Sequence, residues 1–215
     1  MDQSTQVVLP SHCYLNFSMS LVLASQSPRR RQLLSSLGID PVVSPGKVHE
    51  EKRADETAKQ YVTRLAAEKC RDGIGRHTDC IVLGADTIGV TQHKGLELVL
   101  EKPLGKAHFI EMMNQLSDSW HTVSTAVAVG SNRDLQVVCV DTRVRVARLP
   151  TNFLEAYWSS GEPADKAGGY GIQGPFQAYI ERIEGSFSAV MGLPLFETRC
   201  LLEQFGVSLN SMTQV

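Results

Sequence analysis

The stretch from residue 21 to residue 31, with the sequence LVLASQSPRRR, constrains the fold more than any other part of the chain. Its four leading apolar residues predict a buried strand, which the polar residues at 25–27 end. Ser27 suits the N-cap of a helix, because its hydroxyl can accept a bond from a free backbone N–H one turn on. Pro28 suits the first helical position, where its missing N–H costs nothing. We therefore expect a strand, a tight turn and the first turn of a helix.

Three arginines, Arg29, Arg30 and Arg31, crowd the start of that helix. The start of a helix is the positive end of its dipole, where cations are mildly unfavourable. We expect the guanidinium groups, the free N–H groups and the hydroxyls of Ser25 and Ser27 to converge on one point, which an anion would stabilise. This pattern predicts a phosphate site. A basic helix start on the surface is the alternative.

Length and composition bound the class of protein. The chain has 215 residues, a net charge of −2 and five scattered cysteines. So small a charge favours neither nucleic acid nor membrane as a stable partner. The cysteines show no zinc or disulfide spacing, which favours the reducing cytoplasm. The longest apolar runs fall well short of the roughly 20 residues that cross a bilayer.

The first 18 residues lack the basic and apolar regions of a signal peptide. We expect either a disordered extension or a true translation start at Met19. The rest is interpreted as one domain over residues 19–208, followed by a short tail over 209–215.

Helical and strand patterns alternate along the domain, which predicts an α/β fold with a mixed sheet. Gly130 and its neighbours form a turn between two long strands, so this pair is expected to be antiparallel. The predicted helices cover residues 28–37, 56–71, 107–116, 152–159 and 193–205. The predicted strands cover residues 21–24, 41–43, 80–90, 96–100, 122–129, 137–146 and 177–183.

Asp86 lies inside the apolar run 81–90. Burying an unpaired charge costs several kcal/mol, so a cation, a metal ion or exposure in a cleft must compensate. The functional interpretation is a general base or metal ligand. The alternative is an aspartate that caps a turn, but the strand pattern resumes at Ile88 and Val90.

Glu101 and Lys102 follow another apolar strand and precede a proline, which ends strand pairing. Charges at a strand end lie where ligand crevices usually form, although a surface ion pair is the simpler interpretation. Glu50 and Glu51 lie in a charged loop. With Asp86 and Glu101 they supply enough oxygen ligands for a magnesium-like ion.

The segment 165–174 contains the pattern G-x-G-x-x-G, which in dinucleotide-binding proteins follows a strand and starts a helix. Here a polar turn precedes the pattern and Pro175 follows it, so we reject a Rossmann site. A flexible loop that approaches a ligand closely fits better. Within it, Gln173 can pair with a base edge and Lys166 can contact a phosphate.

Five motifs occur in order along residues 21–206. They are LASQSPRR at 23–30, LGADT at 83–87, LEKP at 100–103, DKAGGYGIQG at 165–174 and VMGLP at 190–194. Together they resemble the Maf family of nucleoside triphosphate pyrophosphatases. The resemblance implies a twisted mixed sheet flanked by helices, with two lobes and a central cleft (a Maf/inosine triphosphatase-like fold).

The resemblance also implies cleavage of a nucleoside triphosphate between its α and β phosphates, with a divalent metal cation (Mg2+ or Mn2+). The proton acceptor of the family falls on Asp86, and its specificity positions fall on Arg29, Thr87 and Gln173. The Asp-Thr pair resembles the branch that takes dTTP and UTP. Family members are often dimers, so a homodimer is an expectation here.

These inferences combine into one scheme, in which Asp86 activates water. The expected phosphate ligands are Ser25, Arg30, Lys69, Lys102 and Lys166, although a solvated lysine is the default for Lys69. The expected metal ligands are Asp86, Glu101 and Glu51, with Glu50 the open alternative to Glu51 because the loop is about one residue shorter than in the family. Modified pyrimidine triphosphates are further candidate substrates, and nucleotide-pool sanitation is the expected role.

The alternative function is a nucleotide- or nucleic-acid-binding regulator of cell division or septum formation, without turnover. The carboxylate in the apolar run favours the enzyme, because anion binding alone gains nothing from an acid beside the phosphates.

Overall fold

The computed structural model describes residues 20–93 and 95–208. The predicted extension over residues 1–18, the start at Met19 and the tail over 209–215 lie outside the described residues. The helices are α1 (Pro28–Ser36), α2 (Ala58–Arg76), α3 (Lys106–Leu116), α4 (Thr151–Ser159), α5 (Phe187–Val190) and α6 (Leu195–Gln204). The strands are β1 (Leu21–Leu23), β2 (Val42–Val43), β3 (Ile81–His93), β4 (Leu96–Leu100), β5 (Ser119–Gly130), β6 (Leu135–Val146) and β7 (Ile180–Glu184).

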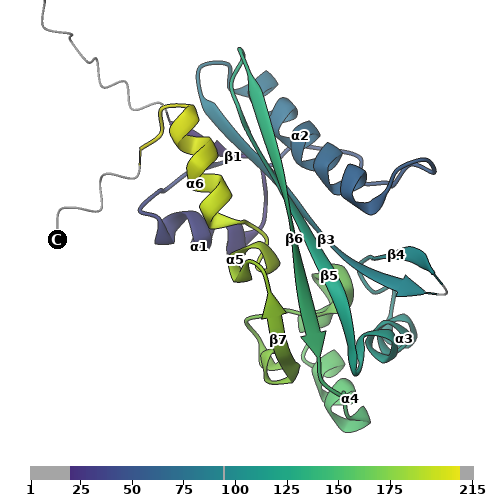
Figure 1. Ribbon diagram of the computed structural model, residues 1–215. Helices are drawn as coiled ribbons and strands as arrows, with labels where there is room; N and C mark the ends of the chain where they lie inside the picture. Colours follow the sequence, from purple (N-terminus) through teal and green to yellow (C-terminus); the bar gives the residue numbers. More distant parts are fainter. Residues whose placement is uncertain (1–19, 94, 209–215) are drawn as a thin grey trace, which may run out of the picture.

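The strands form one seven-stranded mixed sheet, as the sequence predicts. The order is β2-β1-β3-β5-β6-β7, and β4 pairs with β3. β1 is parallel to both β2 and β3, whereas β3, β5, β6 and β7 pair antiparallel. The long strands β3, β5 and β6 run through the middle of the molecule and link its two ends (Figure 1).

Helices cover both faces of the sheet. α2 packs on one face through apolar side chains such as Tyr61, Val62 and Leu65, which meet β3 and β5. The other face meets α1, α3, α4 and α6, in a larger core around Phe109 and Phe176. Figure 1 shows α2 on one side of the long strands and α1 and α6 on the other. No helix in the part of the chain described here is both long and apolar enough to cross a membrane.

Several expected boundaries shift for identifiable physical reasons. α2 runs on to Arg76 instead of ending near residue 71, and so includes Gly73 and Gly75. A side chain at Gly73 would place its Cβ 2.6 Å from Val82 Cγ1, so this glycine lets the helix lie close to the sheet. The strand expected over 177–183 begins only at Ile180, because residues 175–179 form a 3-10 turn that buries Phe176 completely.

The strand–turn–helix unit at the start of the domain is confirmed, with Pro28 as the first residue of α1. The predicted cap bond is wrong, because the hydroxyl of Ser27 makes no bond to the helix. Instead, Ser25 Oγ accepts a bond from the Ser27 backbone N–H at 3.2 Å. The turn is therefore held by Ser25, two residues before the N-cap.

Candidate active site

A gap along one edge of β3 positions the site. β5 pairs with β3 from Val82 to Val90 along one edge. On the other edge, β1 pairs only as far as Leu83, and β4 begins to pair at Gly89. The part of β3 between these two partners carries Asp86 and Thr87. The free backbone edge of β3 therefore faces an opening, which both residues line.

This opening is a cleft with a volume of about 1050 Å3. Ligand pockets of this order, about 300–1000 Å3, hold small molecules of nucleotide size. The cleft is lined by every expected site residue except Glu51, namely Ser25, Arg29, Arg30, Lys69, Asp86, Thr87, Glu101, Lys102, Lys166 and Gln173. The N-terminal end of α1 opens into the same space through Ser27 and Pro28.

Arg30 is the cation most firmly fixed in the cleft. Its residue is 8% exposed, and its Nε donates to the Gly192 carbonyl at 2.8 Å. Its terminal nitrogens donate to Ser25 Oγ at 2.9 Å and to Thr87 Oγ1 at 3.3 Å. Burial lowers the pKa of the guanidinium and the nearby Asp86 opposes that shift. Since arginine stays charged in proteins, these bonds hold a permanent positive charge against the edge of β3.

The three arginines do not converge. Arg29 and Arg30 line the cleft, but Arg31 is exposed and its guanidinium pairs with Asp40 at 3.2 Å. Successive residues on a helix point about 100° apart, so three in a row cannot face one ligand. The expected contribution of Arg31 is therefore wrong.

Asp86 belongs to a charged cluster in which Lys69 pairs with both Asp86 and Glu50. Lys69 Nζ donates to Asp86 Oδ1 at 2.6 Å and pairs with Glu50 Oε1 at 2.5 Å. The lysine side chain is 14% exposed, so the default interpretation of a solvated lysine is wrong. α2 crosses the sheet face next to β3 and points this polar residue at the gap. Two acids thus share one ammonium group.

Burial acts on both acids in the same direction, but their net pKa shifts are opposite. Burial raises the pKa of Asp86, and the opposing charges of Lys69 and Arg30 only partly offset it. Burial also raises the pKa of Glu50, but the bond from Lys69 and the charges of Lys69, Lys102 and Arg30 outweigh it, so its net pKa is lowered. Asp86 is the acid whose proton affinity the fold moves towards that of a general base.

Glu50, rather than Glu51, is the loop acid that reaches the cleft. Glu51 points away from it, 77% exposed, and pairs with His49 at 3.5 Å. The Glu51 carbonyl accepts a bond from Arg64, which holds this part of the loop against α2. The expectation that Glu51 reaches the cleft is therefore wrong, and Glu50, the alternative that the sequence left open, lines it instead.

The glycine-rich loop closes the other side of the cleft. The Gly168 N–H donates to the Glu101 carbonyl at 3.1 Å, which ties this loop to the residues that follow β4. Gly168 and Gly169 have φ values of +76° and +68°, which favour glycine. Lys166 Nζ is bonded within the loop, to the Glu162 carbonyl at 2.7 Å and to Asp165 at 2.9 Å. Gln173 lines the cleft and is exposed.

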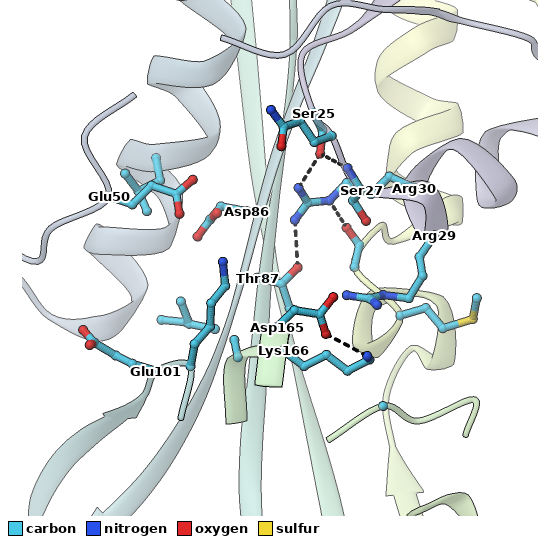
Figure 2. A pocket seen from close by; sticks show the side chains of 18 of the residues that line it. Ser25, Ser27, Arg29, Arg30, Glu50, Asp86, Thr87, Glu101, Asp165 and Lys166 are labelled. Carbon is cyan, nitrogen blue, oxygen red and sulfur yellow. Dashed lines mark hydrogen bonds and ion pairs between the residues drawn. The ribbon is translucent and has the colours of Figure 1, made fainter. Parts of the chain in front are cut away.

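Opposite charges therefore face each other across the cleft. Figure 2 shows Glu50 and Asp86 on one side, Arg29 and Arg30 on the other, and Thr87 between them. An anionic ligand with several negative oxygens can contact the guanidinium groups while its reacting centre faces Asp86.

The carboxylates fit a hard divalent cation. Glu50 and Asp86 already share the ammonium of Lys69 as a cation, and Glu101 lines the same cleft. Among the residues with described positions, no group of three histidine, cysteine or acidic side chains forms a preformed metal site. Mg2+ commonly takes one or two carboxylates and completes its shell with water and substrate phosphates, which this donor set allows.

Two buried residues that bond residues of the cleft wall were not identified from the sequence. Thr125 is fully buried, and its hydroxyl lies 2.7 Å from the Ala189 carbonyl and 3.0 Å from Thr87 Oγ1. His121 Nε2 bonds the Tyr170 hydroxyl at 2.7 Å, and burial lowers the pKa of His121 to about 4. Both interactions join distant segments, so local sequence carried no signal for them.

The chain is similar to known proteins over most of its length. The family model described as Maf-like protein matches residues 20–205. A dTTP/UTP pyrophosphatase of Vibrio parahaemolyticus is 47% identical over 189 residues, which cover 87% of this chain and 98% of that protein. A dTTP/UTP pyrophosphatase of Idiomarina loihiensis is 47% identical over 193 residues, 87% of this chain and 96% of that protein. The protein of the same name from Hahella chejuensis is 42% identical over 89% of this chain and 94% of its own length.

Proposed function

The chain belongs to the Maf family, and from this membership we propose that it is a nucleoside triphosphate pyrophosphatase that hydrolyses dTTP and UTP. One observation carries the proposal furthest. The buried acid Asp86 faces the buried arginine Arg30 across a cleft of nucleotide size. The three relatives compared above carry this activity in their names.

The triphosphate is proposed to bind at the arginine side of the cleft. Arg30 is held by the Gly192 carbonyl and by two hydroxyls, so its charge is positioned before substrate arrives. Arg29 and the free N–H groups at the start of α1 add donors next to it. Lys102 and Lys166, which also line the cleft, are the proposed further cations.

Asp86 is the proposed general base. Its carboxylate removes a proton from a water molecule as that water attacks the α phosphorus, and diphosphate leaves. Such proton transfer contributes about 10²–10⁴-fold to a rate. The arginines stabilise the charge that develops on the phosphate oxygens, and this positioning and electrostatic stabilisation supply most of the catalysis.

A divalent cation is a proposed cofactor. Asp86 and Glu50, with Glu101 beside them, are the residues that would hold Mg2+ or Mn2+ in this cleft. Such an ion neutralises phosphate charge and lowers the pKa of bound water.

Base selection is proposed to involve Thr87 and Gln173. Thr87 lies beside Arg30 on the edge of β3, and Gln173 lies on the glycine-rich loop that faces it. A site that pairs polar base edges rejects analogues that leave these groups unpaired. Modified pyrimidine triphosphates are further proposed substrates, and removal of unwanted nucleotides from the pool is the proposed role.

The proposed location is the cytoplasm, and no stable nucleic-acid or membrane partner is proposed. The proposed assembly is a homodimer. A regulator that binds nucleotides without turnover would gain nothing from Glu50 and Asp86 beside the phosphates.

Hydrolysis of UTP in ¹⁸O-labelled water with Mg2+ tests the proposed bond. Attack at the α phosphorus puts the label into UMP and leaves diphosphate unlabelled, which mass spectrometry reads directly. Label in diphosphate, or release of single phosphate with UDP, would contradict the proposed mechanism.

A further inference from the structure

Glu162 is an acid of the cleft wall that the proposed mechanism does not use. It begins a 3-10 turn over Glu162–Asp165, and its side chain lines the cleft. Its Oε1 accepts a bond from the Tyr157 hydroxyl at 3.1 Å. The same hydroxyl accepts a bond from the Gly171 N–H at 3.0 Å. The carboxylate is thereby fixed to the glycine-rich loop.

The carboxylate lies against the backbone on both sides of Gln173. A Cβ atom added at Gly174 would lie 2.2 Å from Glu162 Oε1, and one added at Gly171 would lie 2.5 Å from it. The absence of side chains at these two glycines leaves room for the acid. Glu162 and Gln173 therefore belong to one small region of the cleft wall.

Most of the hydrogen-bonding capacity of Glu162 is unused. Within the part of the chain that the structure describes, its carboxylate accepts the one bond from Tyr157 and has no ion-pair partner. A carboxylate can accept about four bonds and, when ionised, donates none. The next acid along, Asp165, is instead paired with Lys166 at 2.9 Å. Lys166 bonds Glu162 through its backbone carbonyl and not through its carboxylate.

Resting on the proposed function, we propose that Glu162 is a specificity-determining residue that accepts the N3–H of the uracil or thymine ring. Gln173 next to it donates from its amide to a ring carbonyl beside N3. Uracil and thymine share this N–H and carbonyl pattern, whereas cytosine has a bare N3 acceptor. An acceptor-only carboxylate pairs with the first pattern and repels the second.

The direct test is Glu162→Gln, with kcat/KM measured for UTP and for CTP by diphosphate release. Glutamine keeps the shape and the acceptor for Tyr157, but its amide N–H can pair with a bare N3. We expect the UTP/CTP ratio to fall by about tenfold or more, the effect of one lost hydrogen bond to a charged group. Asp165→Asn is the matched control, since it removes an acid from the same turn and should leave the ratio unchanged.

Gly174→Ala is the second variant and keeps every charge. Gly174 has φ −91° and ψ −164°, a conformation open to alanine, and the new Cβ displaces the carboxylate. We expect the ratio of kcat/KM for UTP to kcat/KM for CTP to fall in this variant too. An unchanged UTP/CTP ratio in both Glu162→Gln and Gly174→Ala would overturn the role of Glu162, as would an equal fall of the ratio in Asp165→Asn. In either case, diphosphate release by these proteins would still support the proposed function. A wild-type protein that releases no diphosphate from any nucleotide would instead overturn the function itself.

Discussion

Lys69 Nζ lies 2.6 Å from Asp86 Oδ1, with Glu50 Oε1 2.5 Å from the same nitrogen. This pairing joins α2 to β3 at the point where one edge of β3 has no strand partner, between the end of its pairing with β1 and the start of its pairing with β4. The ammonium offsets part of the burial that raises the pKa of Asp86. It thereby keeps a buried acid ionisable, which a general base requires.

Replacing Lys69 with methionine should move the acid limb of the pH–rate profile to higher pH. The lysine lowers the pKa of Asp86, so its removal lets burial raise that pKa further, and a base must be deprotonated to act. The measurement is kcat/KM for UTP against pH. Lys59→Met is the control, because Lys59 lies on the same helix but pairs with Asp141 at 2.9 Å. An acid limb that stays in place in Lys69→Met would contradict the coupling.

Asp86→Asn should stabilise the fold at neutral pH. Because the folded pKa of Asp86 is raised above 3.8, its ionisation weakens folding as the pH rises through the folded pKa. Asparagine is neutral at every pH, so the variant should have the larger free energy of unfolding at pH 7. The gap should close as the pH falls towards 4. Urea denaturation across this range measures it.

Asp165→Asn gives the opposite sign and serves as the control. The bond from Lys166 lowers the pKa of Asp165, so that acid stabilises the fold above pH 3.8 and loses this effect as the pH falls. An Asp86→Asn variant that is less stable than wild type at pH 7 would show that pairing outweighs burial.

Arg30→Lys should weaken the enzyme although it keeps the charge. A lysine cannot bond the Gly192 carbonyl, Ser25 and Thr87 from the positions of one planar guanidinium. Loss of one charge-assisted bond, worth about 1.5–3 kcal/mol, lowers kcat/KM by roughly 10- to 100-fold. Arg31→Lys is the matched control, since Arg31 pairs with exposed Asp40 outside the cleft. Equal effects of the two variants would remove the special role of Arg30.

Gln173→Ala should flatten the preference among bases more than it slows the chemistry. Gln173 lines the cleft from the glycine-rich loop, and none of its side-chain atoms bonds Asp86, Lys69 or Glu50 in the described part of the chain. A panel of triphosphates, assayed for diphosphate, gives the spread of kcat/KM. Gln177→Ala is the control, because Gln177 is an exposed residue in the 3-10 turn that follows. A uniform fall for every base would assign Gln173 to catalysis or folding instead.

Local pattern was enough to predict the parts of the fold that local forces determine. The strand–turn–helix around Pro28, the hairpin of β5 and β6 and the mixed sheet follow from periodicity and turn residues. Asp86 was identifiable because an acid in an apolar run needs compensation. These features depend on residues close together in the sequence.

The remaining contacts depend on how distant segments pack. Lys69 is on the polar side of α2, and only the placement of α2 against β3 turns that side towards the cleft. The choice between Glu50 and Glu51 depends on the path of a loop without periodicity. The wrong expectation that Arg31 joins the phosphate site was avoidable, because helical geometry directs its side chain away from those of Arg29 and Arg30.

The central claim is tested most directly by diphosphate release from dTTP and UTP with Mg2+, comparing wild type with a folded Asp86→Asn variant. The account predicts turnover by wild type and a loss of about 10²–10⁴-fold in the variant, the contribution of a general base. Turnover in Asp86→Asn equal to that of wild type, or none in wild type, would contradict it.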